Sequence, residues 1–244
     1  MLNRRYRLTE LFGIPVYVDA SCIFLLLMMV ANAGSLTYGV GAAIILAASI
    51  VAHELGHALT AASFGYKTRD ITISLLGGCA SLIALPRTAW KEFLTAIAGP
   101  LVSFVLSALG FFLYRTAPGG SMWLNSMLYY MGAMNLMLGA FNLLPGFPMD
   151  GGRIFRSVMR LWFTREKATY IAMWVGRVFA IWLGLTGLEA TLGGGSWGLV
   201  RMLIAYMIWR EGYREYLTAK EEERFRVWTQ ADFEARVSPP PYAD

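Results

Sequence analysis

The sequence has little charge, only two histidines and only two cysteines, and these shortages exclude whole classes of protein. Charged residues make up 15% of its 244 residues, while hydrophobic residues make up 57%. An average soluble domain has about 25% charged residues. A single soluble core could not bury so much apolar surface, whereas a lipid bilayer accommodates it. The two cysteines, Cys22 and Cys79, are far apart in the sequence, so they predict neither a disulfide framework nor a cysteine metal site.

Six apolar segments have lengths that fit membrane-spanning helices. A helix rises 1.5 Å per residue and needs about 20 residues to cross the hydrocarbon layer. The sixth segment is short by this measure, and we expect Trp197 and Trp209 to anchor it at the interfaces. The first segment is too long for the core of a signal peptide and lacks a cleavage site. The segments are 15–33, 38–64, 93–114, 122–144, 169–190 and 196–209.

Between the second and third segments, the pattern indicates strands rather than a helix. Residues 68–76 alternate between polar and apolar at first and then meet Gly77-Gly78. Residues 80–85 form a second apolar run, which Pro86 ends. Such a pattern is typical of a strand, a turn and a second strand. We therefore expect a mainly α membrane protein with six transmembrane helices and a small β-hairpin or sheet near the cytoplasmic membrane surface.

The basic residues are unevenly distributed among the connections. With six crossings and a cytoplasmic N-terminus, 18 of the 21 lysines and arginines fall in cytoplasmic segments, and Arg115 alone falls in an outer loop. This asymmetry follows the positive-inside rule. It predicts a multi-pass protein of the cell (inner or plasma) membrane with both termini in the cytoplasm. It also accounts for the net charge of +5 without a nucleic-acid partner.

The chain is expected to divide into a six-helix core, residues 1–212, and a cytoplasmic juxtamembrane helix with a proline-rich tail, residues 213–244. The tail mixes acidic, basic and aromatic residues, which indicates a solvated helix. A surface that docks a partner or gates a substrate is the alternative. Arg177 lies in the middle of the fifth segment. We expect a structural partner for it, and contact with a substrate is the alternative.

His53 and His57 are the only histidines in the chain, and they lie four residues apart. On a helix this spacing places two imidazoles on one face, where both can bind one metal ion. Glu54 can then accept a proton from a water that zinc activates. Ionisable residues within an apolar segment cost roughly 2.5–3.5 kcal/mol each on insertion scales, so such a cluster predicts a functional site. A structural histidine pair bonded to neighbouring helices is the alternative.

Two histidines leave a catalytic zinc ion short of its usual third protein ligand. Because the chain has no third histidine and no well-placed cysteine, a carboxylate is expected. Asp150 is favoured, since it lies in a stretch with two prolines and three glycines at the cytoplasmic end of the fourth segment. Irregular backbone at membrane depth is tolerated where it lines a cavity. An ordinary Asp-Gly turn is the alternative for this motif. The other acids considered are Asp19, Glu92 and Glu189.

Two motifs together resemble the site-2 protease family of intramembrane zinc metalloproteases, and in particular its compact six-helix archaeal and bacterial type. The first is His53-Glu54-Leu55-Gly56-His57. The second runs Asn142-Leu143-Leu144-Pro145-Gly146-Phe147-Pro148-Met149-Asp150-Gly151-Gly152-Arg153 and is similar to the family's Asn-x-x-Pro-x-x-x-x-Asp-Gly. Gly13-Ile14-Pro15, Gly77-Gly78 and Ala98-Gly99-Pro100 are further points of similarity. The resemblance covers about residues 8–212.

The resemblance implies a role for each matching residue. His53, His57 and Asp150 would bind one catalytic Zn²⁺ ion, and Glu54 would be the general base and acid. Asn142 would hold the substrate or stabilise the oxyanion. The hairpin would pair with an unwound strand of the substrate. The first and sixth helices would flank the path by which the substrate enters.

The function that the resemblance implies is hydrolysis of peptide bonds within or next to transmembrane segments. The expected partner, besides the bilayer, is a single-pass membrane-protein substrate, such as a membrane-tethered transcription regulator or its inhibitor. A non-catalytic binder of membrane proteins and a zinc transporter are the alternatives, and Glu54 argues against both. The sequence departs from some relatives because it contains no PDZ or CBS module and has Ser103 where they have asparagine.

Overall fold

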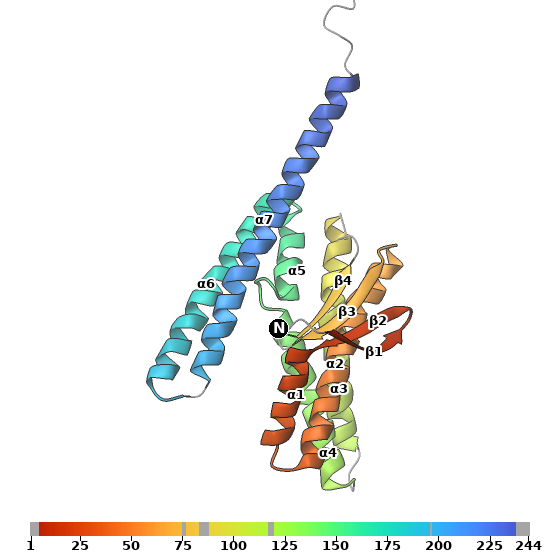
Figure 1. Ribbon diagram of the computed structural model, residues 1–244, viewed down its shortest axis with the longest axis vertical. Helices are drawn as coiled ribbons and strands as arrows, with labels where there is room; N and C mark the ends of the chain where they lie inside the picture. Colours follow the sequence, from red (N-terminus) through yellow and green to blue (C-terminus); the bar gives the residue numbers. More distant parts are fainter. Residues whose placement is uncertain (1–4, 75–76, 83–87, 117–119, 196, 238–244) are drawn as a thin grey trace, which may run out of the picture. The chain divides into compact units, whose positions relative to one another are not determined.

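The computed structural model describes residues 5–74, 77–82, 88–116, 120–195 and 197–237 (Figure 1). The described chain is mainly helical and includes one small sheet. It divides into two compact units, Met1–Leu144 and Pro145–Asp244. The first unit contains the sheet and four helices, and the second contains three helices.

The sheet of the first unit has four strands in the order β1-β2-β3-β4. The strands are β1 (Arg5–Leu11), β2 (Ile14–Asp19), β3 (Thr68–Ser74) and β4 (Gly77–Leu82). β3 and β4 pair antiparallel, which confirms two paired strands here, but Gly77-Gly78 begin β4 instead of forming the predicted turn. Residues 75–76 and 83–85 of the predicted strands lie outside the described residues. β1 and β2 also pair antiparallel, whereas β2 and β3 are parallel neighbours. The hairpin is therefore half of a larger sheet.

The first apolar segment does not form one long helix. Its beginning is strand β2, and α1 covers only Ala20–Asn32. In β2, Ile14, Val16 and Val18 are buried at every second position, which is the periodicity of a strand. The carboxylate of Asp19 then caps α1 by accepting a hydrogen bond of 2.8 Å from the backbone of Ser21. The prediction of a single helix over residues 15–33 was therefore wrong for its first five residues.

Three long helices of the first unit pack against one another: α2 (Leu36–Ser63), α3 (Ala89–Thr116) and α4 (Met122–Asn142). They match the predicted helices at 38–64, 93–114 and 122–144, and they run side by side in Figure 1. Polar contacts join them within apolar surroundings. The Asn135 amide donates to Ser49 Oγ at 2.8 Å, and the Ser107 hydroxyl donates to the Gly132 carbonyl at 2.8 Å. Such contacts satisfy polar groups that lipid could not.

The second unit consists of α5 (Asp150–Met159), α6 (Arg165–Leu192) and α7 (Gly198–Val237). α6 matches the segment predicted at 169–190. α5 was not expected as a helix, and Gly151-Gly152 lie within its first turn rather than in irregular backbone. α7 matches the sixth segment but continues without a break to Val237. The expected division between residues 212 and 213 falls inside this helix and stays a prediction.

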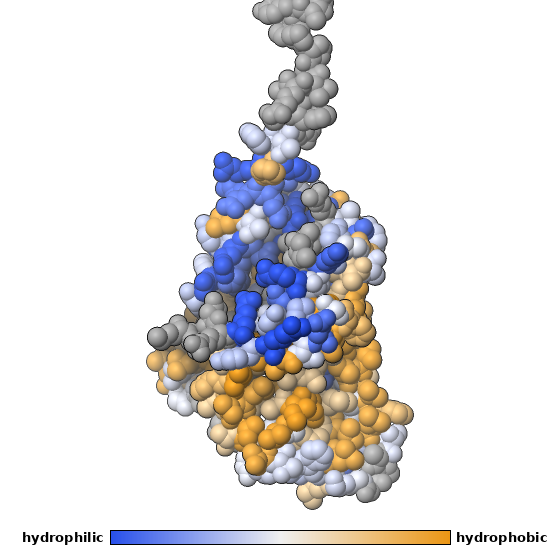
Figure 2. Space-filling view, turned by 45° about the vertical axis from the view of Figure 1, so that its right-hand side comes forward, coloured by the Kyte–Doolittle hydropathy of each residue, from blue (hydrophilic) through white to orange (hydrophobic). Residues whose placement is uncertain are grey.

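Among the described residues, α2, α3 and α6 are long and apolar enough to cross a membrane, and α1 contains a shorter apolar stretch. On the face shown in Figure 2, hydrophobic and hydrophilic residues gather in separate areas. These features fit a membrane protein. That six helices span the bilayer stays a prediction.

Arg177 of α6 lies among aromatic rings of its own unit. Its guanidinium carbon is 4.9 Å from the ring centre of Trp174, 4.5 Å from that of Trp209 and 5.8 Å from that of Tyr213. A cation over these ring faces is attracted by their negative potential. The rings are thus a structural partner for Arg177, and they join α6 to α7.

Candidate metal centre

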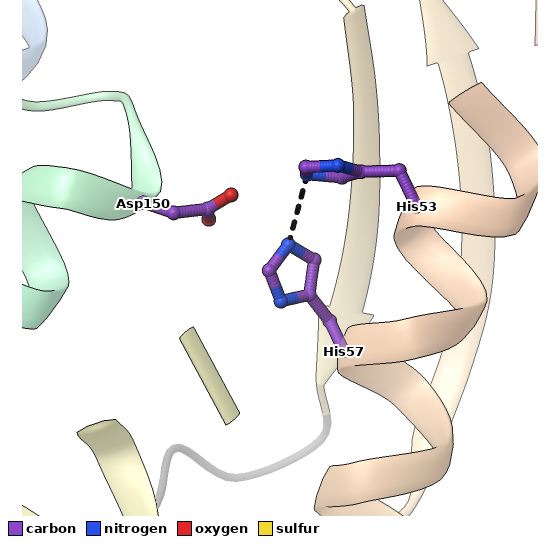
Figure 3. Close-up of side chains that lie close together, drawn as sticks. All are labelled: His53, His57 and Asp150. Carbon is purple, nitrogen blue, oxygen red and sulfur yellow. Dashed lines mark hydrogen bonds between the residues drawn. The ribbon is translucent and has the colours of Figure 1, made fainter. Parts of the chain in front are cut away.

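His53 and His57 lie on one face of α2, and both side chains are buried. The Nε2 atoms of their rings are 3.2 Å apart, and the dashed line in Figure 3 marks this contact. The spacing of four residues therefore places both imidazoles on one face of the helix, as predicted, and brings two of their nitrogens close together.

The opposite nitrogen of each ring is held by α3. His57 Nδ1 lies 2.7 Å from the backbone oxygen of Thr95, and His53 Nδ1 lies 2.9 Å from Ser103 Oγ. A carbonyl oxygen only accepts, so Nδ1 of His57 donates to it, which leaves Nε2 as the nitrogen that could bind a metal ion. The Ser103 hydroxyl can accept from His53 in the same way. Such contacts fix the orientation and tautomer of metal-binding histidines.

The distance between the two Nε2 atoms fits a single zinc ion. Two nitrogens that bind one tetrahedral zinc at 2.0–2.1 Å are roughly 3.3 Å apart, close to the 3.2 Å found here. Gly99 of α3 borders this space. A Cβ atom at residue 99 would lie 2.2 Å from His57 Nε2 and 2.7 Å from His53 Nε2. A side chain at residue 99 would therefore collide with both imidazoles, and glycine avoids this collision.

Two glycines account for the close approach of α2 and α3 at this point. A Cβ atom at Gly56 would lie 2.9 Å from the backbone oxygen of Ala98 and 2.9 Å from Val102 Cγ2. Gly56 thus lets the histidine helix contact the backbone of α3, and Gly99 lets the α3 backbone reach the imidazoles. The structure gives a physical reason for the glycines of the His53–His57 motif and of Ala98-Gly99-Pro100.

Glu54 follows His53 on α2, and its side chain is buried with 7% exposed. Its carboxylate and the two imidazoles thus come from five consecutive residues of one helix. A carboxylate beside a metal site can exchange protons with water or substrate. The role of Glu54 stays a prediction.

Asp150 is the first residue of α5, in the second unit, and its side chain is buried. The loop before α5 packs tightly on the first turn of the helix. A Cβ atom at Gly152 would lie 2.7 Å from the backbone carbon of Gly146 and 2.8 Å from the nitrogen of Phe147. The start of a helix also favours a negative charge. The irregular stretch of residues 143–149 therefore serves to begin a short helix with an aspartate.

Within the part of the chain that the structure describes, His53, His57 and Asp150, the side chains drawn in Figure 3, each offer an atom that could bind a metal ion. The other acidic residues considered from the sequence have a different role or lie in other parts of the helices. Asp19 caps α1, Glu92 lies in the first turn of α3, and Glu189 lies near the end of α6. That these three residues are the actual ligands stays a prediction.

Asn142 is the last residue of α4, and its amide nitrogen donates to the backbone oxygen of Leu138 at 3.0 Å. Its role toward substrate stays a prediction. Sequence reasoning missed the contacts of Thr95 and Ser103 with the histidines. Ser103 was noted only as a departure from some relatives, although a polar residue in an apolar helix was a usable signal. Thr95 acts through its backbone, so no residue type could have indicated it.

Comparisons with known proteins give consistent similarities. The profile of peptidase family M50 matches residues 41–125 and 119–183. A zinc metalloprotease of Methanocaldococcus jannaschii is 32% identical in an alignment of 228 positions that covers 91% of this chain. A protein of Synechocystis sp. is 34% identical in an alignment of 252 positions that covers 95% of this chain. Stage IV sporulation protein FB of Bacillus subtilis is 27% identical over 159 residues, or 65% of the chain.

Among solved structures, the site-2 protease from Methanocaldococcus jannaschii matches with a TM-score of 0.65 and 30% sequence identity. The match covers 87% of this chain and 95% of that chain. The curated relatives are longer. The matched regions span 65% of the Synechocystis protein, 62% of the Methanocaldococcus metalloprotease and 54% of the Bacillus protein.

Proposed function

The chain belongs to peptidase family M50, the site-2 proteases, and on that basis we propose that it is a zinc metalloendopeptidase that cleaves within or next to transmembrane segments. The observation that carries the proposal is the orientation of His53 and His57. Their Nε2 atoms are 3.2 Å apart, and their Nδ1 atoms are held by α3. This arrangement turns the Nε2 atoms of both rings toward one point, as two ligands of a single metal ion require.

The proposed ligands are His53, His57 and Asp150, which would bind one zinc ion. Two imidazoles and one carboxylate are a ligand set found in catalytic zinc sites, and such sites keep a fourth position open for water or substrate. When bound, zinc polarises the carbonyl to be attacked and makes water a nucleophile at neutral pH. The Methanocaldococcus relative is named a zinc metalloprotease. Thr95 and Ser103 would keep both rings oriented toward the ion.

Glu54 and Asn142 would supply the proton transfer and the substrate contact. The carboxylate of Glu54 accepts a proton as water attacks the peptide carbonyl, and it then delivers the proton to the leaving amine. The Asn142 amide has two hydrogens. One is used in the bond to the Leu138 backbone, so the other can donate to a substrate oxygen.

The sheet supports the proposed mode of substrate binding. A peptide bond inside a helix is shielded from attack, so a transmembrane substrate has to unwind before cleavage. β4 ends the sheet order, with β3 as its neighbour, and an edge strand presents backbone groups that an extended peptide can pair with. We propose that an unwound segment of a single-pass membrane protein adds to this hairpin.

The proposal includes a location and a class of substrate. Six helices would cross the cell membrane with both termini in the cytoplasm, as the distribution of basic residues predicts. The three long apolar helices α2, α3 and α6 are consistent with this. Membrane-tethered transcription regulators or their inhibitors are the proposed substrates, by analogy with the family.

Two other functions would use the same histidines. A non-catalytic member would bind membrane proteins without cutting them, and a transporter would pass zinc along a path. Neither needs a general base, so the buried Glu54 beside the histidines favours hydrolysis over both.

Replacing Glu54 by glutamine tests the proposed reaction. Purified Glu54→Gln should keep its zinc, because the proposed ligands are intact. It should cut a co-reconstituted single-pass reporter at least about 100-fold more slowly than the wild type, since a general base contributes roughly 10²–10⁴-fold. Zinc is measured by mass spectrometry and cleavage by gel and product sequencing.

Glu189→Gln is the matched control, because Glu189 is an acid near the far end of α6. It should cleave at the wild-type rate. Undiminished cleavage by Glu54→Gln, or a wild-type protein that contains no zinc when purified from zinc-supplemented cells, would contradict the proposed function.

A further inference from the structure

Arg156 is a charged residue that is almost completely buried in the second unit. Its exposed fraction is 1%, and it is the largest of the fully buried side chains described. The guanidinium carbon lies 4.9 Å from the ring centre of Phe147, in the loop before α5. One guanidinium nitrogen donates to Glu215 Oε2 of α7 at 2.9 Å. One side chain of α5 therefore joins the loop that precedes Asp150 to the last helix of the chain.

Glu215 lies among basic groups. Besides its bond to Arg156, its Oε1 lies 4.0 Å from an Arg153 guanidinium nitrogen. Burial raises the pKa of Glu215, but the positive charges of Arg156, Arg153 and Arg165 and the hydrogen bond from Arg156 outweigh burial and lower its pKa below the ordinary value. The pair is thus ionised on both sides. Substitution of either residue would remove a charge that compensates the other in buried surroundings, which is costly.

The beginning of α5 is fixed by close packing against α6. A Cβ atom at Gly146 would lie 3.0 Å from the Cα of Gly176, and one at Gly152 would lie 2.7 Å from the Gly146 backbone. The loop is therefore held between the first turn of α5 and the middle of α6. Asp150 lies within this packed region.

The end of α5 is fixed differently. α5 has ten residues, so it is about 15 Å long. The Arg156–Glu215 bond holds its last turn to α7. Arg156 lies six residues after Asp150, or about 9 Å along the axis. A change at Glu215 can therefore tilt the helix that carries Asp150.

A second ion pair shows what α7 requires for its own packing. Arg165, at the start of α6, lies 3.2 Å from Glu222 of α7. This pair joins α6 to α7 at the next turns of α7 and does not involve α5. The two glutamates lie seven residues apart on one helix and each pairs with an arginine, but only Glu215 connects to the helix of Asp150.

We propose that Arg156 and Glu215 are positioning residues for the metal ligand Asp150, so that α7 determines how well this carboxylate is placed for zinc. The inference rests on the proposed function, because it takes Asp150 as a zinc ligand. Metal ligands have to be held within about 0.5 Å of their productive position. α5 is short, and its two ends are fixed by different elements. Glu215 also lies beyond the apolar part of α7, so it connects the hydrophilic part of that helix to the metal centre.

The rate of zinc release tests this without relying on catalysis. The full-length protein is loaded with zinc in detergent micelles, and release to a chromogenic chelator is followed. Glu215→Gln should release zinc about 10-fold faster than the wild type, at the lower end of the effects of groups that orient metal ligands. Glu215→Asp, which keeps the charge, should restore part of the loss. Glu222→Gln is the matched control and should release zinc at the wild-type rate.

A double-mutant cycle separates positioning from a general structural role. In an Asp150→Asn background the carboxylate is already lost, so Glu215→Gln should accelerate release little further. A general destabilisation would accelerate release by the same factor in both backgrounds. If Glu215→Gln does not fold, Arg156→Lys supplies the same cycle, because it keeps the charge but loses the planar group over Phe147.

The outcomes distinguish this inference from the proposed function. Equal acceleration in both backgrounds, an unchanged rate in Glu215→Gln, or an equal effect of Glu222→Gln would overturn the positioning role. In each case the wild type still holds zinc, so the metal centre stands. A wild-type protein that does not bind zinc, or an Asp150→Asn variant that releases it no faster, would overturn the proposed ligand set and the inference with it.

Discussion

The two regions that supply the proposed metal ligands are built on different principles. His53 and His57 lie in the C-terminal half of a 28-residue helix and are held by a second long helix packed against it. Asp150 begins a ten-residue helix after an irregular loop. The histidines are oriented by neutral hydrogen bonds and backbone contacts, whereas the helix of Asp150 is held by glycine packing at one end and by an ion pair at the other.

This difference indicates that the site is more rigid around the two histidines than around Asp150. Two long helices in close backbone contact have no easy movement that would relieve a clash. The ten-residue helix α5 is held by loop packing at its start and by ion pairs with Glu215 at its end, so it can tilt more easily than a long helix in backbone contact. We therefore expect equal substitutions to cost more on the histidine side than on the aspartate side. The predictions below test this expectation.

The largest effect is expected from Gly99→Ala. The new methyl group would lie 2.2 Å from His57 Nε2, in the space where both imidazoles meet. Zinc affinity should fall by more than about 100-fold, beyond the usual range for residues that only orient ligands. Competition with a fluorescent chelator measures it. Gly184→Ala is the control, since its methyl group would approach only Ala205 Cβ, at 3.7 Å. A normal zinc affinity in Gly99→Ala would contradict the expectation that the histidine side of the site is rigid.

Ser103→Ala removes the hydroxyl beside His53 Nδ1 but adds no clash. Loss of such an orienting group typically lowers metal affinity 10–100-fold, and we expect a value of about 10-fold because the Thr95 contact of His57 stays. Ser107→Ala, on the same helix, removes a hydroxyl that donates to Gly132 instead. It should leave zinc affinity unchanged. Equal losses in both variants would point to packing of α3 rather than to ligand orientation.

Gly152→Ala tests the aspartate side of the site with a clash at the start of α5. Its methyl group would lie 2.7 Å from the Gly146 backbone, a clash comparable in kind to that at Gly99. Because α5 can shift, we expect zinc affinity to fall only about 3–10-fold, with overpacking that costs roughly 1–3 kcal/mol of stability. Gly212→Ala, where the nearest atom is Met173 Cγ at 3.5 Å, is the control. A loss as large as that of Gly99→Ala would show that both sides are equally rigid.

The smallest effect is the pH dependence of the Arg156–Glu215 pair. Because the pKa of Glu215 is lowered from 4.5 in the folded protein, ionisation of Glu215 stabilises the fold fully above pH 4.5. This contribution is lost as the pH falls through the lower folded value. The difference in thermal midpoint between wild type and Glu215→Gln should be constant from pH 8 to pH 5 and shrink in more acidic solution. A difference that grows on acidification would contradict the assignment.

Much of the candidate site could be predicted from local sequence. The four-residue spacing of His53 and His57 fixes their common face on any helix, and Asp150 stood out because its surroundings exclude a long regular helix. The strand β2 could also have been predicted, since Ile14, Val16 and Val18 alternate with more exposed residues. Its apolar composition concealed this period, because the strand runs directly into the apolar helix α1.

The contacts that orient these residues could not be predicted. The backbone of Thr95 binds His57 across 38 residues of sequence, and Arg156 binds Glu215 across 59. Neither pair has a local pattern, because each depends on how separate helices pack. The start of α5 at Asp150 also depends on the glycine contacts of its loop.

The sequence by itself determined the chemistry of this protein: an apolar chain, two histidines and a glutamate on one helix, and an aspartate in a broken stretch. Side-chain type and helical period are sufficient for that, because both are local properties. Only the tertiary structure decided that α3 fixes the histidine rings and approaches them closely at Gly99, and that α7 holds the helix of Asp150 through Arg156. These contacts form between separate helices, and their distances follow from packing rather than from spacing along the chain.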